Sequence, residues 1–518
     1  MVAVALTTQT ALLRWCIPAC WIVSIGWLVR TDVVPQWVQM HAPSPPPAAA
    51  TLSVIRDEWW GIYHQATKIG YAHQRWIPRG HRDAPAVAGG AAGLTLTSVT
   101  ELELPVQGTM RSVNIAGAVL LNDQHRVIGL SATIASGPQV LVVTGTPGAQ
   151  GGLEISIETG GRRTAALTLP TEVQLPELLT APWMLANAQA GMRWAKEVFD
   201  PLMQQRQTAV VDVLQEARPS VVERQWTSGP VLVVRTTMGD LVSTSRVTRD
   251  GCVLREETPL GFIMVRETPE TARLIHRRMN VARSDLAVQL AVPTNLRLVD
   301  PRGTRTLTVR LTGVGRTAAG LQLRSSRQRW VPQDGGAGVL TMTQETLEHL
   351  TTSRLPVQDP AAAQWLPPSP LVQSDDPEIR AQARDIIGQT TDAWEAAIRI
   401  HRWVAKTLQK TPSVGIPSAV EVLHTKQGDC NEHTALFTAL ARSVGIPTQI
   451  CAGLVYYRNA FYYHAWPRVF VGQWVAMDPT LDQTVADATH IQLIEGELSQ
   501  QVRILGLLGR LRIEGVNE

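Results

Sequence analysis

The chain has 518 residues, too many for one hydrophobic core, which predicts roughly two to four domains. With 44% hydrophobic and 18% charged residues, it has the composition of an ordinary globular protein. The formal net charge of +3, without a run of like charges, argues against a nucleic-acid-binding function.

The N-terminal segment 15–29 carries no charge, and with residues 11–13 it approaches the roughly 20 residues that a membrane-spanning helix needs. We therefore predict a membrane anchor. The alternative is a cleaved signal peptide, which would leave a secreted protein, but no small-residue cleavage site follows closely. The Pro/Ala-rich residues 41–50 predict a spacer that holds an extracytoplasmic body away from the membrane.

The region 51–300 alternates apolar and polar residues with a period of two, as at Leu102, Leu104 and Val106. This pattern predicts a large antiparallel β-rich domain, with a hairpin turn at Asp250-Gly251. Helices are predicted at 176–197 and 269–278. Five aromatic residues are predicted to pack in the core, with a binding groove as the alternative: Trp59, Trp60, Tyr63, Tyr71 and Trp76.

The rest of the chain divides at a proline-rich stretch. Residues 301–372 are predicted to form strands and this proline-rich connection, residues 373–496 a second folded domain, and residues 497–518 a C-terminal tail. The second domain opens with helices at Asp376-Pro377 and at 394–408. The predicted fold class of the whole chain is α+β, with an N-terminal membrane helix.

Five cysteines are too sparse for a disulfide scaffold and lack zinc-site spacing. Cys16 and Cys20 lie in the apolar N-terminal segment, and a bridge between Cys252 and Cys451 stays open. Cys430 is different, because Gly428 breaks the chain, Asp429 can cap, and an apolar stripe predicts a helix from there to 444. The partial positive charge of a helix N-terminus predicts a lowered pKa for this thiol.

Three strands are predicted after this helix, at 449–456, 461–470 and 473–477. His464 lies on the second strand, and Asp478 follows the third, so the two can lie side by side across the ladder. An imidazole between a thiol and a carboxylate suits acyl transfer, because it takes the thiol proton and later protonates the leaving amine. We predict Cys430 as nucleophile, His464 as base and Asp478 as the group that orients His464.

This ordered set of motifs resembles the transglutaminase-like superfamily of papain-type cysteine enzymes over residues 374–496. The matching motifs are Gly428-Asp429-Cys430, Gly445-Ile446-Pro447, His464-Ala465-Trp466 and Asp478-Pro479-Thr480. The resemblance implies an α+β catalytic domain, a Cys thioester, and transfer to water or an amine, with no metal or organic cofactor. The expected substrate is a peptide or protein amide in the bacterial envelope.

The resemblance also implies roles for residues around the triad. Trp466 and Trp474 would wall the active site, the Cys430 N–H would contribute to an oxyanion hole, and Gln427 is a candidate second donor. Relatives commonly carry an acidic residue where this chain has Arg468, so different electrostatics are expected on the substrate side. The alternative function is a non-catalytic envelope binding or scaffold protein that uses the same fold.

A metal site is a competing interpretation of the same residues. Cys430, His433, His464 and Asp478 could formally hold an ion, but no known ligand spacing selects them, and we predict none. Asp487 and His490 are predicted to pack within a loop. The oligomeric state is not predicted.

Overall fold

The computed structural model describes residues 55–516 apart from 79–80, 82–92, 150, 171, 202–204, 240, 259–260, 276–290, 315–319, 414, 417, 498–499, 502–503, 505–506 and 508–509. The predicted membrane helix and spacer lie outside these residues. Among the helices that are described, none has both the length and the apolar character needed to cross a membrane.

The structure is mostly β, with 47% of residues in strands and 18% in helices, so the predicted α+β class is wrong. The two helices predicted in the β-rich region account for part of the error. Segment 176–197 forms only η2 (Pro176–Leu178) and α3 (Pro182–Leu185), because its end pairs as a strand after Gly191, whose φ is +88°. The second segment is the short helix α4 (Pro269–Arg273), capped by Thr268.

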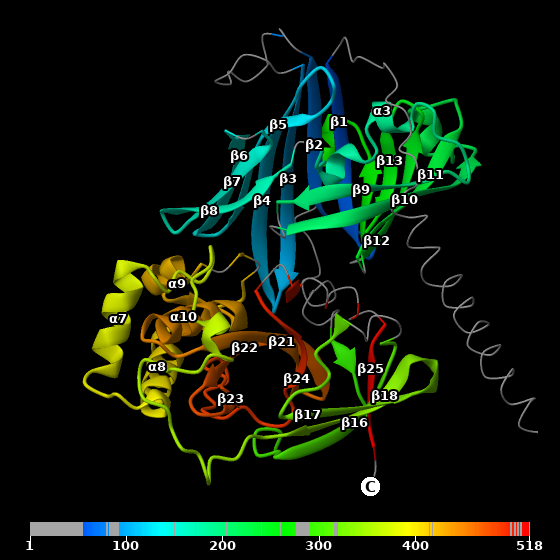
Figure 1. Ribbon diagram of the computed structural model, residues 1–518. Helices are drawn as coiled ribbons and strands as arrows, with labels where there is room; N and C mark the ends of the chain where they lie inside the picture. The colour runs from blue at the N-terminus through cyan, green and yellow to red at the C-terminus, as the bar shows by residue number, and fades with distance from the viewer. Residues whose placement is uncertain are drawn as a thin grey trace, which may run out of the picture.

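A single antiparallel sheet of 14 strands dominates the N-terminal half (Figure 1). Its order is β8-β7-β6-β5-β4-β3-β2-β1-β14-β13-β12-β11-β10-β9, so almost every strand pairs with its neighbour in sequence. The strands are β1 (Arg56–His64), β2 (Thr67–Pro78), β3 (Leu94–Val106), β4 (Thr109–Leu121), β5 (Val127–Ser136), β6 (Gln139–Pro147), β7 (Leu153–Thr159), β8 (Arg162–Leu169), β9 (Arg193–Asp200), β10 (Gln205–Ala217), β11 (Val231–Met238), β12 (Leu241–Thr248), β13 (Val253–Glu257) and β14 (Phe262–Arg266).

Details of this sheet follow from the sequence pattern. The predicted hairpin at Asp250-Gly251 is present between β12 and β13, with Gly251 at a φ of +80°. Trp59, Trp60 and Trp76 are buried, as core packing requires. Cys252 and Cys451 are both free thiols, so the bridge left open between them is not formed.

Two smaller sheets and the helices α7, α8, α9 and α10 make up most of the described second half of the chain. The sheets have the orders β15-β22-β21-β24, with β23 beside β22, and β17-β18-β16-β25, while β19 and β20 form a short parallel pair. The elements are β15 (Val292–Pro293), β16 (Thr306–Thr312), β17 (Gln328–Gln333), β18 (Ala337–Thr343), α7 (Pro377–Ile387), α8 (Ala393–Thr407), β19 (Gln409–Lys410), α9 (Ala419–Thr425), β20 (Gln427–Gly428), α10 (Cys430–Ser443), β21 (Thr448–Tyr457), β22 (Ala460–Phe470), β23 (Trp474–Ala476), β24 (Ile491–Glu495) and β25 (Arg512–Gly515).

Each of the three longer helices begins at an aspartate. The side chains of Asp376, Asp392 and Asp429 accept backbone N–H bonds at the starts of α7, α8 and α10. Helix α10 is central: it packs on α7, α8 and α9, and on strands β21 and β22. Its side chains are buried over almost the whole of its length, which predicts a rigid mount for Cys430 in its first turn.

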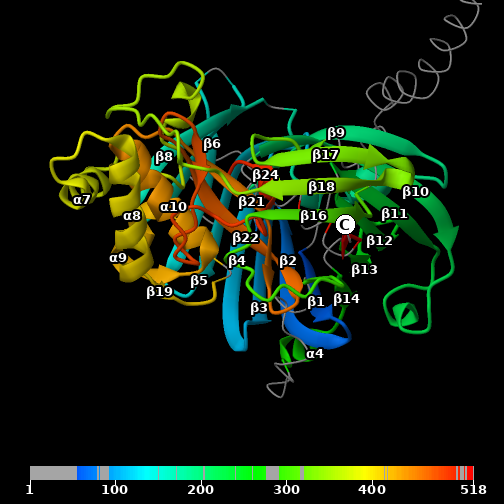
Figure 2. The same ribbon diagram turned by 90° about the horizontal axis from the view of Figure 1, so that it is seen from below.

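The two smaller sheets share one hydrophobic core. Val309 and Leu340 of one sheet belong to the same buried cluster as Leu454 and Phe461 of the other, and Ile513 of β25 completes it. Figure 2 shows β16, β17 and β18 side by side across the molecule, next to β21 and β24. The strands β16, β17 and β18, which precede residue 373, and β25, which follows residue 496, therefore belong structurally to the unit that carries helix α10.

The large sheet contacts the helical part at its β5 to β8 end. Both views place helices α7 to α10 beneath this end of the sheet (Figures 1 and 2). Arg162 at the start of β8 pairs with Asp375 at 2.5 Å, and Gln139 at the start of β6 reaches helix α10. One end of the N-terminal sheet is thus fixed next to the helix that carries Cys430.

Candidate active site

Cys430 is the first residue of α10, and a capping box fixes this helix start. The Asp429 carboxylate accepts from Asn431 N at 3.0 Å, and the Asp429 N–H donates to Glu432 Oε2 at 2.8 Å. Gly428 makes this possible, because its φ is +151° and a Cβ there would lie 2.3 Å from the Glu432 side chain. Cys430 itself is half-buried.

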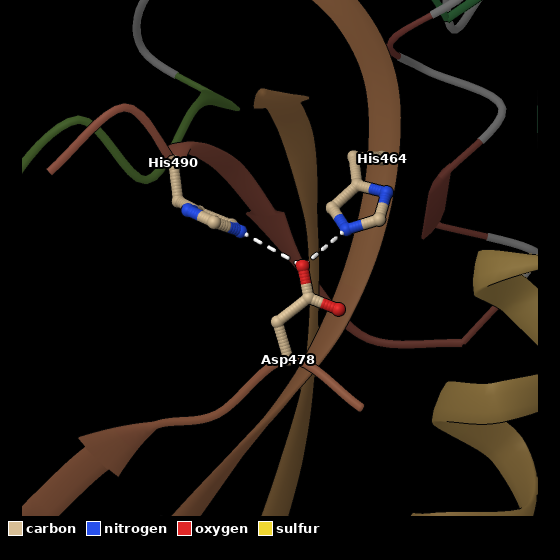
Figure 3. A group of neighbouring side chains, drawn as sticks. All are labelled: His464, Asp478 and His490. Carbon is tan, nitrogen blue, oxygen red and sulfur yellow. Dashed lines mark hydrogen bonds and ion pairs between the residues drawn. The ribbon is translucent and has the colours of Figure 1, made fainter. Parts of the chain in front are cut away.

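His464 and Asp478 form a short buried contact. His464 lies on β22 and Asp478 follows β23, its neighbour in the sheet, and the distance from His464 Nε2 to Asp478 Oδ2 is 2.7 Å (Figure 3). Asp478 Oδ1 accepts the backbone N–H groups of Thr480 at 2.8 Å and Leu481 at 3.0 Å. The Asp478 carboxylate is therefore held by donors on both of its oxygens.

The charge state of Asp478 follows from these donors. Burial alone would raise the pKa of the Asp478 carboxyl, but the nearby His464 and His490, which donate to it, hold that pKa well below its usual range. Asp478 is thus a carboxylate at neutral pH. Because Nε2 of His464 faces this carboxylate, Nδ1 is the nitrogen of the ring that can accept a proton from a nucleophile.

Helix α10 packs against β22, which brings Cys430 to the strand that carries His464. The backbone N–H of Ala465, the residue after His464, donates toward the Cys430 thiol. The helix that begins at Cys430 thus packs on the strand that carries His464, and that strand pairs with β23, which ends just before Asp478.

The predicted lowering of the Cys430 pKa is not what the structure supports. Burial raises the pKa of the Cys430 thiol well above its ordinary value, and the charge of Asp429 raises it further. The helix N-terminus does not compensate, because the capping carboxylates that complete it lie beside the sulfur. Both influences favour the thiol over the thiolate form of Cys430.

The two tryptophans predicted to wall the site have different surroundings. Trp466 is fully buried, with its ring centroid 6.0 Å from that of His464 and 5.1 Å from that of His490. It therefore supports the two imidazoles from the protein side. Trp474 is half-buried and packs against Phe470 at 5.4 Å between ring centroids.

Arg468 lies in the interior of the protein. Its side chain is 5% exposed, donates to Ser326 Oγ at 2.5 Å, and lies 3.9 Å from the Glu345 carboxylate. The different substrate-side electrostatics expected from this residue stay a prediction. Gln427 is exposed on β20, three residues before Cys430.

The sequence pattern did not reveal a second histidine at Asp478. His490 Nε2 lies 3.0 Å from Asp478 Oδ2, the same oxygen that contacts His464 (Figure 3). Nor did it reveal His401 of α8, whose Nε2 lies 3.2 Å from the Asp478 backbone oxygen. In the sequence, His490 lies three residues after Asp487 in the loop before β24, a spacing that also suits simple loop packing.

The sheet topology explains why His464 and His490 meet. Strand β21 lies between β22 and β24, and its Gly453 pairs with His464 on one side and with Gln492 on the other. A Cβ at Gly453 would lie 1.9 Å from the Ile491 oxygen, so only glycine allows β24 to approach this closely. His490, just before β24, is thereby brought to the far side of Asp478.

His464, Asp478 and His490 could in principle hold a metal ion, since one ligand atom from each lies within 4.8 Å of the others. These atoms are, however, the ones that form the 2.7 Å and 3.0 Å contacts, each of which needs a proton on the imidazole. A metal would have to displace both protons. The donor set fits a hydrogen-bonded group better than a metal site. His433 instead directs its Nδ1 to the backbone oxygen of Asp429, at 2.7 Å.

Three carboxyl groups, those of Asp429, Glu432 and Glu421, lie close together near the start of α10, where the large sheet contacts this helix. Gln139 donates to Glu432 Oε1 at 2.9 Å and accepts from Ser413 Oγ at 3.2 Å. Burial, and then the charge of Glu432, raise the pKa of the Asp429 carboxyl well above its usual range. Burial also raises the pKa of Glu421, on α9, to about 7, with the charge of Glu432 adding to the shift.

Replacing Glu421 with glutamine is expected to change how stability depends on pH. The pKa of Glu421 is about 7 in the folded protein and close to the ordinary glutamate value in the unfolded chain. Between these two pH values the folded state keeps a proton on Glu421 that the unfolded state has released. The contribution of Glu421 to the free energy of unfolding therefore falls as the pH rises from about 4.5 to about 7 and then levels off. Glu421→Gln should remove this decrease.

Urea unfolding across this pH range measures the effect. Glu158→Gln is the matched control, since Glu158 is exposed on β7. An unchanged pH slope in Glu421→Gln would contradict the assignment of the buried proton to Glu421.

Comparison with known proteins agrees with the residues that meet here. The family model described as the transglutaminase-like superfamily matches residues 380–479, which include Cys430, His464 and Asp478. No curated protein matches the sequence.

Three solved structures share parts of the fold at low similarity. A candidate cysteine protease from Cytophaga hutchinsonii is 16% identical, covers 41% of this chain and 82% of its own, and has a TM-score of 0.28. A β-barrel-like protein of unknown function from Brucella abortus is 10% identical over 42% of this chain and 96% of its own, with a TM-score of 0.30. A candidate protease from Parabacteroides distasonis is 11% identical over 75% of this chain and 70% of its own, with a TM-score of 0.18.

At these TM-scores the structural likenesses carry no argument about function, and the assignment depends on the family match together with the motifs and the site geometry. Residues 380–479 of this chain belong to the transglutaminase-like superfamily.

Proposed function

We propose that the protein is a cysteine enzyme that cleaves or transfers the acyl group of a peptide-like amide through a thioester on Cys430. The observation that carries the proposal is the 2.7 Å contact between His464 Nε2 and Asp478 Oδ2. His464 lies on β22, the strand against which helix α10 packs. This contact orients the imidazole and leaves Nδ1 as the base. The Asp478 carboxylate stabilises the imidazolium that forms.

The reaction has two halves. In the first, Cys430 Sγ attacks the amide carbonyl carbon while its proton passes to His464 Nδ1, and the C–N bond then breaks as His464 returns that proton to the leaving amine. This gives a thioester and a free amine. In the second, water or an amine gives up a proton to His464 and attacks the thioester, and the thiol of Cys430 is restored.

Preorganised donors would stabilise the charge that develops on the carbonyl oxygen. The backbone N–H of Cys430 is the proposed donor, because it belongs to the first turn of α10 and points out of the helix start. Gln427, exposed three residues earlier, is the proposed second donor.

Trapping of the thioester tests this function directly. The protein would be incubated with peptide p-nitroanilides and glutamine-containing peptides, quenched in acid, and analysed by intact-protein mass spectrometry. The expected result is a mass increase equal to the acyl group, located on Cys430 by peptide mapping and removed by hydroxylamine. Addition of a primary amine separates the acceptors, because hydrolysis releases an acid and transfer releases an amide.

Cys252→Ala is the matched control, since Cys252 is a half-buried free thiol on the large sheet and its loss should leave the adduct unchanged. Absence of any adduct from the whole donor panel, in a folded protein, would favour the alternative of a non-catalytic scaffold.

A further inference from the structure

His490 lies between two carboxylates in the interior of the protein. Its Nε2 is 3.0 Å from Asp478 Oδ2, and its Nδ1 is 3.3 Å from Asp487 Oδ1 and 3.2 Å from the Asp487 backbone oxygen. The side chains of all three residues have no exposed surface. Each nitrogen of this ring therefore faces only acceptors.

A neutral imidazole does not fit this environment. It carries one N–H and one lone pair, so one of its nitrogens would present a lone pair to a carboxylate oxygen. The protonated ring donates from both nitrogens and satisfies both sides. Burial alone would lower the pKa of His490, but Asp478 and Asp487 raise it above the ordinary value, in agreement with this geometry.

The charges around His490 alternate in sign. Arg302 Nη1 lies 3.0 Å from Asp487 Oδ2, so the order is Arg302, Asp487, His490, Asp478 and finally His464. Gln483 and the Thr489 N–H also donate to Asp487, at 2.9 Å and 2.7 Å.

Other charged groups near this row are paired elsewhere. Arg327 donates to the Asp487 backbone oxygen at 2.7 Å and pairs with Glu345 at 3.2 Å. His401 faces the Asp478 backbone oxygen, with Asp482 at 3.9 Å on its other nitrogen. Trp466 covers one side of the His490 ring.

We propose that His490 is a positioning residue that remains an imidazolium in the resting enzyme, fixing Asp478 and offsetting part of its charge so that His464 stays a neutral base. The proposal rests on the proposed acyl-transfer function. With one donor on each side of Oδ2, the Asp478 carboxylate cannot rotate away from His464. With a positive charge beside Asp478, less negative potential reaches the His464 ring.

The charge of His490 can be measured without turnover. Histidine side-chain nitrogen NMR of the wild-type protein should show the imidazolium signal of His490 at about pH 7.5, above the ordinary histidine pKa of about 6.5. That signal should be absent in His490→Gln. A neutral His490 at this pH would overturn the proposal, whether or not the protein proves to be an enzyme.

The effect on catalysis is measured by the pH dependence of kcat/KM. His490→Gln keeps a neutral donor within reach of Asp478 but removes the charge, so the acid limb should move to higher pH by on the order of one unit. His490→Phe removes the donor as well, and kcat should also fall by roughly 10- to 100-fold with little change in KM. A role in packing alone predicts that both variants keep the wild-type pH profile.

Asp487→Asn is the second, independent variant, because it keeps the shape of the loop but removes one of the two charges that hold His490 protonated. Its imidazolium signal should titrate at lower pH than in the wild type. An unshifted acid limb in folded His490→Gln would also refute the proposal. Absence of acyl-transfer activity in the wild-type protein, together with an intact His490 imidazolium signal, would refute the proposed function instead.

Discussion

Replacing Cys430 with alanine is expected to reduce turnover by about 10⁴-fold or more. The change removes only the sulfur that would form the thioester. Because Cys430 is half-buried at a helix start that Asp429 and Glu432 cap, the free energy of unfolding should change by about 1 kcal/mol or less. Initial rates and urea unfolding of the same preparation measure the two effects.

Cys430→Ser refines this test, because a hydroxyl keeps the hydrogen-bonding capacity but needs a stronger base than a thiol does. It should leave measurable but severely reduced turnover. Wild-type turnover in Cys430→Ala would exclude the thioester and with it the proposed reaction, whereas Cys252→Ala should behave as the wild type.

Asp478→Asn is expected to reduce kcat by roughly 10³- to 10⁴-fold, because an amide can present an N–H to His464 and so stabilise the wrong tautomer of the ring. It should also destabilise the fold by about 3–5 kcal/mol, since the His490 imidazolium loses a buried partner at 3.0 Å. Rates and the free energy of unfolding at neutral pH measure the two effects.

Asp482→Asn provides the control for this variant. Asp482 is four residues along the same loop, its side chain is 71% exposed, and its change should affect neither quantity by much. If Asp478→Asn kept the wild-type kcat, His464 would not depend on Asp478 for its orientation, and the proposed base would have to be reconsidered.

Local sequence signals predict the framework of the site. Gly428 and Asp429 predict the start of α10, and the apolar alternation with its turns predicts the strands that bring His464 to Asp478. Both features depend on residues that are close in sequence, because β22 and β23 are consecutive strands. That is why the 2.7 Å contact between His464 and Asp478 could be expected from the sequence alone.

The features that the sequence did not reveal depend on partners that are distant in the chain. His490 meets Asp478 only because β24 pairs on the other side of β21, a choice of neighbour that local patterns do not specify. Arg468 has the sequence position of a substrate-side residue, but it is covered by Ser326 and Glu345 of a different part of the chain. The raised pKa of Cys430 likewise results from burial, which only the assembled fold provides.

Pairing between segments that are far apart in the sequence also explains the error in the fold class. The strands β16, β17, β18 and β25 join the residues before and after the helices into one sheet, so strand content rises even within the half of the chain where the helices lie. In the N-terminal half, period-two patterns are informative because each hairpin is local. The segment 176–197 is misleading because its apolar residues suit a short helix as well as a strand.

Arg302 and Arg327 lie well before residue 380, and Asp487 and His490 lie after residue 479, yet these four residues form one network of contacts with Asp478 and His464. A fragment cut to the boundaries of the family match would keep Cys430, His464 and Asp478 but lose the arginines that hold the loop behind them. For expression of a minimal catalytic unit, or for transplanting this domain into another protein, the smallest faithful piece has to begin before β15 and extend through β25, because both strands belong to the shared core.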